Sequence, residues 1–479
     1  MLEKTGKQPE FVDFYLPFGG KLKASNKWVK RAAMIPWAEV EEVYGRNFAK
    51  KKGKRGIPAR VAFGALLVQT LESLTDRETV EFVEENPYVQ YFLGFGEFQL
   101  EAPFDASMMV HFRKRFPRED WNRLNEVLVE RARESSSDND GEDKPKGNRG
   151  KLVIDATCAP GDLRHPSDLS LLDEARRKTE KIIDELYEQC RTQLSVKPKT
   201  YRRKAAKRAG RVLRQKKARV KKIRKECRYQ LNALERNLNT IGELRKLCAE
   251  EALSDRRCRD LEVLTEFFHQ RESLIREGKT QVFDKIYSLA QPHVRAIYRG
   301  KGGAKYEFGA KLSIGVADGY AFLDKLSWDP YNECHDVVGQ LLAYHRRFGH
   351  YPESIHADKI YHTRENRQLC SELGIRLSAV PLGRPGPGHP DKLRQLRQDE
   401  RDRNVVEGKI GQCKRRFGLG RIMTKLKETS ESCISAIFFA ANLVKWEAEL
   451  LLRLIFKLST IIKASCRIST IALALRQSA

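Results

Sequence analysis

The stretch KLVIDATCAPGD, residues 151–162, decides the fold, because it places a single carboxylate, Asp155, inside a run of apolar and β-branched residues. Such a run is typical of a buried strand. The proline and glycine that follow predict a loop, so we expect Asp155 at the end of this strand. A buried carboxylate is costly unless it is paired or binds a metal, so the chain should supply partners for Asp155 elsewhere.

The composition indicates a large, strongly basic protein. The chain has 479 residues, and its 90 Lys and Arg residues against 64 Asp and Glu residues give a formal charge of +26. This length is sufficient for about two to four domains. The excess of positive charge favours a polyanionic partner, nucleic acid before an acidic membrane, although a solvated basic surface also explains it.

The cysteines and the apolar stretches favour a cytoplasmic protein that does not enter a membrane. None of the ten cysteines forms a CxxC pair or a Cys/His cluster with zinc spacing, and the polar N-terminal stretch has no signal-peptide pattern. We therefore expect free thiols in a reducing compartment. The most apolar stretch, residues 433–444, is too short to cross a bilayer and predicts a buried helix.

The first part of the chain, residues 1–134, has helical periodicity and predicts an all-α domain. Within it, PFDASMMVHFRKRF (residues 103–116) predicts a short helix that carries Arg113, Lys114 and Arg115. A basic helix after a helical pair resembles the reading helix of a helix-turn-helix, so these three residues are candidates for DNA binding. The alternative is a small helical bundle with a solvated basic face. Residues 135–150 are polar and rich in Ser, Asp and Gly, which predicts a linker.

After the linker, the pattern changes to strands and helices. The predicted elements are a strand at 151–157, strands at 307–316 and 320–328, a helix at 334–349, a strand at 354–358, a helix at 363–374, a strand at 375–381 and a long helix from about Lys392. The Asp318-Gly319 turn makes a hairpin of the second and third strands, and the later alternation favours parallel pairing. A five-stranded mixed sheet flanked by helices is the ribonuclease H-like arrangement, an α/β fold. We expect this core at residues 151–167 and 293–425, interrupted by a helical insertion at 168–292 and followed by C-terminal helices at 426–479.

Three acids are expected to meet in this topology. Asp155 ends the first strand, Asp358 ends its neighbour in the sheet, and Glu407 lies on the helix after the last strand. Converging carboxylates require a cation, and hard oxygen ligands select Mg²⁺ or Mn²⁺. Two such ions about 4 Å apart serve phosphoryl transfer. Three other aspartates compete with Asp358 for the position of the second acid: Asp318, Asp324 and Asp329. Two of them have an alternative explanation as turn residues, because Asp318 suits a hairpin turn and Asp329 precedes a proline.

The region of Glu407 gives the most specific signal. Arg403, Glu407 and Lys414 are separated by four and seven residues, so they fall within roughly 40° of one another on one helix face. If Glu407 faces the metals, the two cations that flank it along the helix are suitably placed for a scissile phosphate bound beside the metals. The alternative is an amphipathic helix with ordinary ion pairs.

The insertion is the most basic part of the chain. Residues 195–225 hold sixteen Lys and Arg and no acid, and they lead into apolar residues spaced 4-3-4-3 from Cys227 to Ile241. This stripe predicts a coiled-coil seam in a helical hairpin or small bundle, which could also pair two protomers. The basic arm would hold DNA through phosphates, without sequence specificity. The alternative is an intramolecular helix pair with a solvated basic face. The candidate DNA-binding residues of the arm are Arg202, Arg203, Lys204, Lys216, Lys217, Lys221 and Lys222.

These motifs resemble the DDE transposases of bacterial insertion sequences, whose C-terminal signature is Y-x2-R-x3-E-x6-K. Arg403, Glu407 and Lys414 match it, whereas Glu400 stands at the tyrosine position. VIDAT resembles the first-acid motif, and HADKIYHTRENR (residues 356–367) resembles the second-acid motif with its nearby tyrosine, Tyr361. Residues 57–116 are similar to the helical domain that precedes the catalytic core in these enzymes.

The resemblance implies a DNA transposase that binds terminal inverted repeats, cleaves the element's ends to free 3′-hydroxyls and joins these to target DNA. It implies Asp155, Asp358 and Glu407 as catalytic metal ligands for Mg²⁺ or Mn²⁺, with Tyr361, Arg403 and Lys414 near the DNA. A homodimer is expected because two ends must be brought together, and no membrane partner is expected. No Walker A motif is present, so we expect no requirement for ATP. Two alternatives are a catalytically inactive DNA-binding protein derived from a transposase and a metal-dependent nuclease of the same fold.

Overall fold

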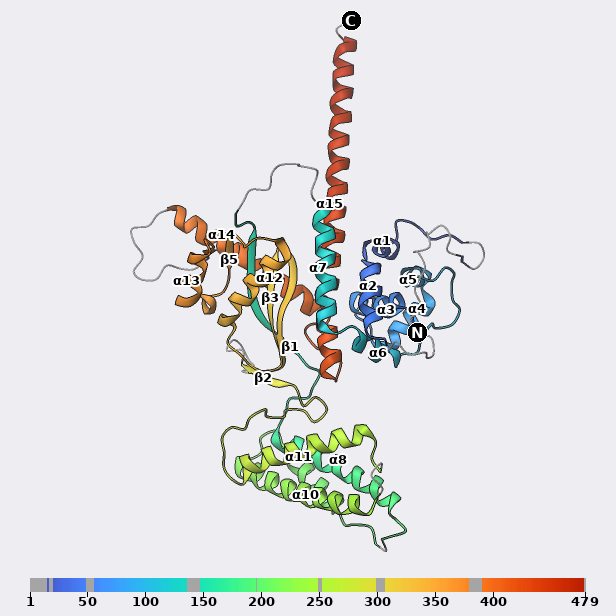
Figure 1. The fold of residues 1–479 in the computed structure, drawn as a ribbon, viewed down its shortest axis with the longest axis vertical. Helices are drawn as coiled ribbons and strands as arrows, with labels where there is room; N and C mark the ends of the chain where they lie inside the picture. The colour runs from blue at the N-terminus through green and yellow to red at the C-terminus, as the bar shows by residue number, and fades with distance from the viewer. Residues whose placement is uncertain are drawn as a thin grey trace.

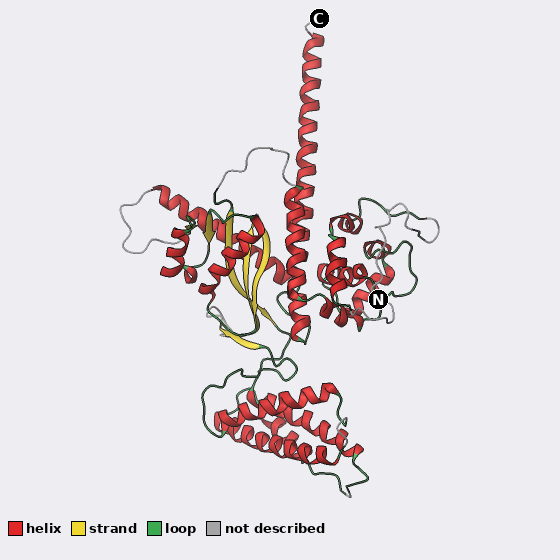
Figure 2. Cartoon of the chain, viewed as in Figure 1, coloured by secondary structure: helices red, strands yellow, loops and turns green. Residues whose placement is uncertain are grey.

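The computed structural model describes residues 15–16, 20–48, 56–135, 147–194, 196–248, 252–298, 306–378 and 390–477, with backbone only at 390–393, 396 and 461–477. Figure 1 shows a sheet-containing core, a group of N-terminal helices beside it and a separate helical bundle that corresponds to the insertion. In Figure 2 the strands are confined to the core, and the other parts are helical. Most of the predicted linker, residues 136–146, lies outside the described residues.

The N-terminal part is helical, as predicted. Its elements are α1 (Lys27–Met34), α2 (Trp37–Arg46), α3 (Ala59–Glu72), α4 (Asp76–Glu85), α5 (Pro87–Phe92), α6 (Met108–Arg115) and α7 (Arg118–Glu134). Phe63 of α3 stacks on Trp121 of α7 at 4.7 Å between ring centroids, and it meets Phe439 edge-on at 5.3 Å. Burying these three rings joins α3, α7 and the C-terminal helix in one apolar core.

A single long helix, α15 (Lys427–Gln477), replaces the several C-terminal helices that the sequence predicted. Its proximal half is buried against α7, α3 and α6, which agrees with the buried helix expected at residues 433–444. Its distal part extends away from the body (Figure 1). No helix among the described residues is long and apolar enough to cross a membrane.

The core is a mixed sheet of six strands, in the order β2-β3-β1-β5-β6 with β4 also paired to β3. The strands are β1 (Lys151–Pro160), β2 (Arg295–Tyr298), β3 (Tyr306–Ala317), β4 (Tyr320–Ser327), β5 (Ser354–His356) and β6 (Arg376–Leu377). β1 runs antiparallel to β3 and parallel to β5, and β5 runs parallel to β6. Apart from β2, this is the strand order expected for a ribonuclease H-like core, so the sheet is compatible with that fold.

Helices and two 3₁₀ turns connect the strands of the core. They are η3 (Glu333–Asp336), α12 (Val337–Phe348), η4 (Lys359–Tyr361), α13 (Arg364–Glu372) and α14 (Pro390–Arg416). α14 packs on β1, β3 and β5 and therefore crosses the centre of the sheet. The hairpin between β3 and β4 turns at Asp318 and Gly319, which both have positive φ, as a two-residue type I′ turn requires.

Two details of the sheet differ from the sequence prediction. The sheet has six strands rather than five, because the four residues of β2 pair with the first part of β3, beside the hairpin. β1 also continues to Pro160, so Asp155 lies in the middle of this strand and not at its end. Asp155 nevertheless lies just beyond the end of the neighbouring strand, because β5 ends at His356, opposite Val153.

The insertion forms a bundle with an apolar core of its own. Its helices are α8 (Asp168–Gln189), α9 (Arg202–Leu213), α10 (Val220–Leu247) and α11 (Asp255–Ile275). The predicted seam faces inward, since Cys227, Leu231, Leu234 and Ile241 are buried in this cluster and α10 packs along α8. The seam therefore belongs to an intramolecular helix pair, the alternative given above, and it is not exposed for pairing two protomers.

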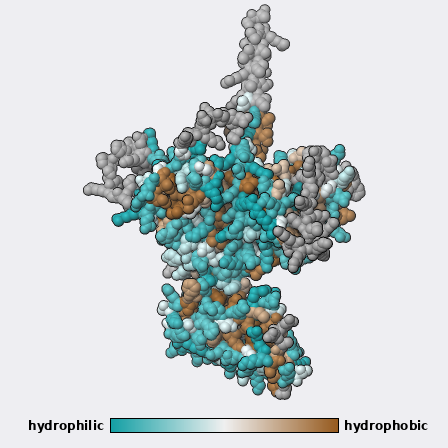
Figure 3. All heavy atoms as spheres, viewed as in Figure 1, coloured by the Kyte–Doolittle hydropathy of each residue, from teal (hydrophilic) through white to brown (hydrophobic). Residues whose placement is uncertain are grey.

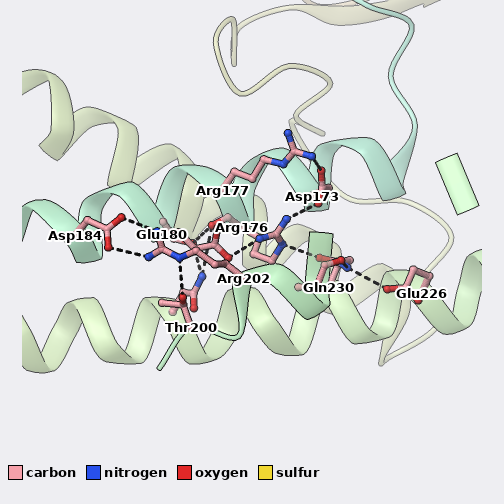
Figure 4. Close-up of polar contacts among 12 residues, drawn as sticks. Asp173, Arg176, Arg177, Glu180, Asp184, Thr200, Arg202, Glu226 and Gln230 are labelled. Carbon is pink, nitrogen blue, oxygen red and sulfur yellow. Dashed lines mark hydrogen bonds and ion pairs between the residues drawn. The ribbon is translucent and has the colours of Figure 1, made fainter. Parts of the chain in front are cut away.

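A buried arginine fixes α8 against α10 (Figure 4). Arg176 is 1% exposed; its Nη2 donates to Asp173 Oδ1 at 2.5 Å, its Nη1 pairs with Glu180, and its Nε donates to Gln230 Oε1 at 3.0 Å. Gln230 in turn donates to the carbonyl oxygen of Ala205 at 3.0 Å, which adds α9 to the network. Because the guanidinium is fully paired, the bundle tolerates its charge inside an apolar core.

Candidate active site

The strand register brings Asp155 and Asp358 to adjacent positions. Val153 of β1 pairs with His356 of β5 in parallel register, and each aspartate lies two residues further along its own strand direction. Asp358 caps η4 by accepting a hydrogen bond from the backbone N–H of Lys359 at 2.7 Å. Asp155 Oδ1 accepts one from the N–H of Ala156 at 2.8 Å. The strand order predicted from the sequence therefore puts these two acids side by side.

α14 adds the third acid and a cation to the same place. Arg403 Nη1 lies 3.2 Å from Asp358 Oδ1, and its Nη2 lies 3.9 Å from Glu407 Oε1, one helical turn away. Glu407 is exposed, whereas Arg403 and Asp358 are half-buried. The guanidinium therefore links the acid at the end of β5 to the acid on α14.

The electrostatics of Asp155 indicate a concentrated negative potential. Burial, together with the nearby negative charges of Asp358, Glu407 and Glu333, raises the pKa of Asp155 to about 6 against the opposing hydrogen bond from Ala156. A carboxyl group in this setting favours either a proton or a bound cation. We refer to Asp155, Asp358 and Glu407 as the acid cluster.

Glu333 is a fourth acid near the acid cluster that was not predicted from the sequence. It begins η3, and its side chain forms an ion pair with Lys311 of β3. η3 and η4 are tied together because Asn366 donates to the carbonyl oxygens of Cys334 and Tyr361, both at 2.8 Å. No local pattern marks Glu333, since only the packing of two turns distant in sequence brings it toward Asp155.

A second group of possible metal ligands lies along the same helix. Within the described part of the chain, His356, Asp399 and Asp402 offer ligand atoms within 4.8 Å of one another. Both aspartates already have cationic partners, Arg376 for Asp399 and Lys151 for Asp402. Burial lowers the pKa of His356, which favours the neutral imidazole. This group is thus balanced in charge, whereas the acid cluster has an excess of negative charge.

The three competing aspartates lie elsewhere. Asp318 is in the hairpin turn, and Asp329 is an exposed residue 3.5 Å from Arg295. Asp324 is buried in β4, where its Oδ1 lies 2.7 Å from Nη1 of Arg347 on α12. These contacts account for all three as structural residues.

Two residues that were predicted to contact DNA, Tyr361 and Arg113, are buried instead. Tyr361 is 0% exposed, so its side chain does not reach the surface in this conformation. Arg113 is 4% exposed and donates to Asp76 Oδ2 at 3.1 Å and to Gln69 Oε1 at 2.7 Å, which ties α6 to α3 and α4. Both residues stabilise packing, and neither presents a group to a phosphate.

The other candidates outside the insertion differ in their accessibility. Arg115 is half-buried, with its Nη1 donating to the hydroxyl of Tyr44 at 3.0 Å and its guanidinium 4.4 Å from the ring centroid of Phe48. Lys114 is exposed on α6, and Lys414 is half-buried on α14. Of the basic run on α6, Lys114 is therefore the residue whose side chain is exposed to solvent.

The insertion presents most of its candidates to solvent. Arg202 is held by Asp184, with both Nη atoms donating to the carboxylate at 2.8 Å. The remaining candidates are exposed on α9, on the α9–α10 connection and on the first turn of α10: Arg203, Lys204, Lys216, Lys217, Lys221 and Lys222. We call these six residues the basic face. A positive surface of this kind suits phosphate contacts.

Comparisons with known proteins match two parts of the chain. Residues 355–444 match a family model described as a transposase DDE domain, and residues 17–115 match one described as a transposase domain (DUF772). An uncharacterized protein of Rhizobium meliloti, ORF8 in the nfe locus, is 35% identical over 143 residues, which cover 30% of this chain and 66% of that protein. No solved structure matches. The first matched range contains Asp358 and Glu407, while Asp155 lies outside both ranges.

Proposed function

Because the chain belongs to the insertion-sequence DDE transposases, we propose that it is a DNA transposase that cleaves the inverted-repeat ends of its element and joins them to target DNA. The observation that carries this proposal is the acid cluster, in which β1, the turn after β5 and α14 each contribute one carboxylate. Hydrolysis would place a water oxygen on the phosphorus and release a 3′-hydroxyl. In the joining step, that hydroxyl would attack a target phosphodiester and release a target 3′-oxygen.

The acid cluster fits a divalent metal by its chemistry, with Asp155, Asp358 and Glu407 as the residues that would hold it. When bound, Mg²⁺ or Mn²⁺ supplies Lewis-acid activation of the attacking oxygen and neutralises charge on the leaving oxygen. Asp155 would contribute its rigid strand position and must be deprotonated to bind. The Arg403 guanidinium, between Asp358 and Glu407, would turn toward a phosphate oxygen once a metal neutralises the two acids.

The basic face and α15 would serve the DNA and a second subunit. The six exposed cations of the basic face would bind phosphates of flanking or target DNA without reading its sequence. Two DNA ends must be brought together, so we propose a homodimer. In Figure 3 the apolar surface includes the part of α15 that leaves the body, where a second copy could bind. Its exposed apolar residues there are Leu451, Leu452, Leu454, Ile455, Phe456 and Leu458.

A plasmid assay tests this function. Purified protein is incubated with Mg²⁺ and a supercoiled plasmid that carries the flanking sequences of its gene, beside the variants Asp155→Asn and Glu407→Gln. We expect cleavage at the element's ends and joined products for the wild type and neither for the variants. Cleavage without joining would indicate a nuclease of the same fold, and binding without cleavage under Mg²⁺ or Mn²⁺ would indicate an inactive DNA-binding protein.

A further inference from the structure

A polar cluster on α14, adjacent to the acid cluster, connects this helix to the sheet. His356 is 0% exposed; its Nδ1 lies 3.6 Å from Asp399 Oδ1, and its Nε2 lies 3.8 Å from Asp402 Oδ2. The Nε2 atom also shares a hydrogen bond with Ser354 Oγ at 3.0 Å. The imidazole at the end of β5 is therefore enclosed between its own strand and two aspartates of α14.

Each aspartate is also bound by a cation from a different strand. Asp399 accepts hydrogen bonds from both Nη atoms of Arg376, at 2.8 and 3.0 Å, and Asp402 accepts one from Lys151 Nζ at 2.7 Å. Arg376 begins β6, and Lys151 begins β1. Together with His356, these contacts fix α14 to three neighbouring strands at once. We call His356, Asp399 and Asp402 the α14 clamp.

One member of the α14 clamp, Asp399, lies on the same face of the helix as the catalytic candidates. Asp399, Arg403 and Glu407 follow one another at intervals of four residues, so their side chains point the same way. The eight steps of the helix from Asp399 to Glu407 span about 12 Å along its axis. A rotation or a slide of α14 that broke the clamp would therefore also move Glu407 away from Asp155 and Asp358.

The charges argue that the clamp supports the metal site and is not itself one. The carboxylates of Asp399 and Asp402 are each balanced by a cation, Arg376 at 2.8 Å and Lys151 at 2.7 Å. A divalent ion placed among them would leave an excess of two positive charges or would have to displace both cations. In the acid cluster, the guanidinium of Arg403 pairs with Asp358 and Glu407, and the three carboxylates together keep an excess of negative charge, so the ion is more favourably bound there.

We propose that His356, Asp399 and Asp402 are positioning residues that set the rotation and height of α14, so that Glu407 faces Asp155 and Asp358. This inference rests on the proposed function, because it takes those three acids as the metal ligands. Mutation of residues that orient metal ligands without binding the metal typically changes metal affinity by about 10- to 100-fold. The clamp should therefore be detectable in metal binding, without DNA and without turnover.

The test measures Mn²⁺ affinity of the full-length protein by electron paramagnetic resonance. We expect Asp402→Lys and Lys151→Glu each to weaken Mn²⁺ binding by about 10-fold or more, and the double variant to restore most of it, because the exchanged pair can form again. Glu235→Gln breaks an ion pair with Arg276 in the insertion and serves as the matched control, with wild-type affinity expected. The far-ultraviolet circular dichroism of each variant checks that it is folded.

The outcomes separate the clamp from the proposed function. Wild-type Mn²⁺ affinity in both single variants would overturn the clamp. Imidazole ¹⁴N coupling to bound Mn²⁺ that disappears in His356→Asn would also overturn it, because His356 would then be a metal ligand. Unchanged Mn²⁺ binding in Asp155→Asn and Asp358→Asn would instead refute the metal assignment of the proposed function, whatever the clamp variants do.

Discussion

Replacing Asp155 with asparagine should stabilise the metal-free core. The side chain lies in the middle of β1, where burial and the charges of Asp358 and Glu407 raise the pKa of its carboxyl from 3.8 to about 6. One pKa unit corresponds to about 1.4 kcal/mol, so the ionised carboxylate costs the folded state about 3 kcal/mol at neutral pH. Asparagine removes the charge and keeps an oxygen that can accept from the N–H of Ala156.

The effect has a defined pH window. Because the pKa of this acid is raised on folding, the folded state binds more protons than the unfolded state between pH 3.8 and about 6. The wild type therefore loses stability as the pH rises through this window, and the loss is complete above it. The advantage of Asp155→Asn should be about 3 kcal/mol at pH 7.5 and about 1 kcal/mol at pH 4.5. Saturating Mg²⁺ should reduce it at pH 7.5, because the ion stabilises only the protein that binds it.

Urea unfolding in EDTA at the two pH values measures the difference, and hydrogen exchange of the β1 and β3 amides assigns it to the sheet. Asp324→Asn is the matched control, because Asp324 is another strand aspartate with a raised pKa, and its side chain is buried. It should destabilise the core, since Arg347, 8% exposed at the side chain, loses a partner at 2.7 Å. A stability loss of 1 kcal/mol or more for Asp155→Asn in EDTA at pH 7.5 would refute the electrostatic reasoning.

Three further predictions concern the insertion and the sheet. Replacing both Arg203 and Lys204 with alanine should reduce the slope of log DNA affinity against log salt concentration by about 2, because each phosphate contact contributes about 0.9. Fluorescence anisotropy titrations from about 50 to 200 mM salt measure this slope, and an unchanged slope would exclude both contacts. Arg176→Met should destabilise the insertion by about 3–5 kcal/mol, because the buried carboxylate of Glu180 loses its ion pair, whereas Asp173 keeps Arg177 as a partner; a free energy of unfolding within 1 kcal/mol of wild type would contradict this. Gly309→Ala should disrupt the β1–β3 pair, because a Cβ would lie 2.1 Å from the carbonyl oxygen of Ala159; unchanged hydrogen exchange of β3 would show that the strands can separate at little cost.

The features that the sequence predicted are those set by local patterns and strand order. The alternation of strands and helices gave β5 as the neighbour of β1, and this alone makes Asp155 and Asp358 adjacent. The spacing of Arg403 and Glu407 predicted that they share one helix face, and in the structure Arg403 Nη2 lies 3.9 Å from Glu407 Oε1. β2 was missed because its four residues carry no alternating pattern and form a strand only by pairing with β3.

Burial of charged and polar side chains was less predictable, because it depends on residues distant in sequence. Arg113 belongs to a basic run that favours a solvated or DNA-binding face, yet Asp76 on another helix neutralises it inside the N-terminal core. Glu333 approaches Asp155 only through the packing of η3 beside η4. Both cases required the tertiary partner to be known first.

The root of the insertion connects its basic face to the core. Asp162, just after β1, pairs with Lys425 at 2.6 Å and with Arg421 in the connection from α14 to α15. Its carbonyl oxygen accepts a hydrogen bond at 2.9 Å from Gln291, where the chain leaves the insertion. Both ends of the insertion are thus attached to one another and to the segment that follows Glu407. Phosphate contacts made by the insertion would therefore orient bound DNA relative to the acid cluster. An insertion joined to the core by a flexible linker would not fix this orientation.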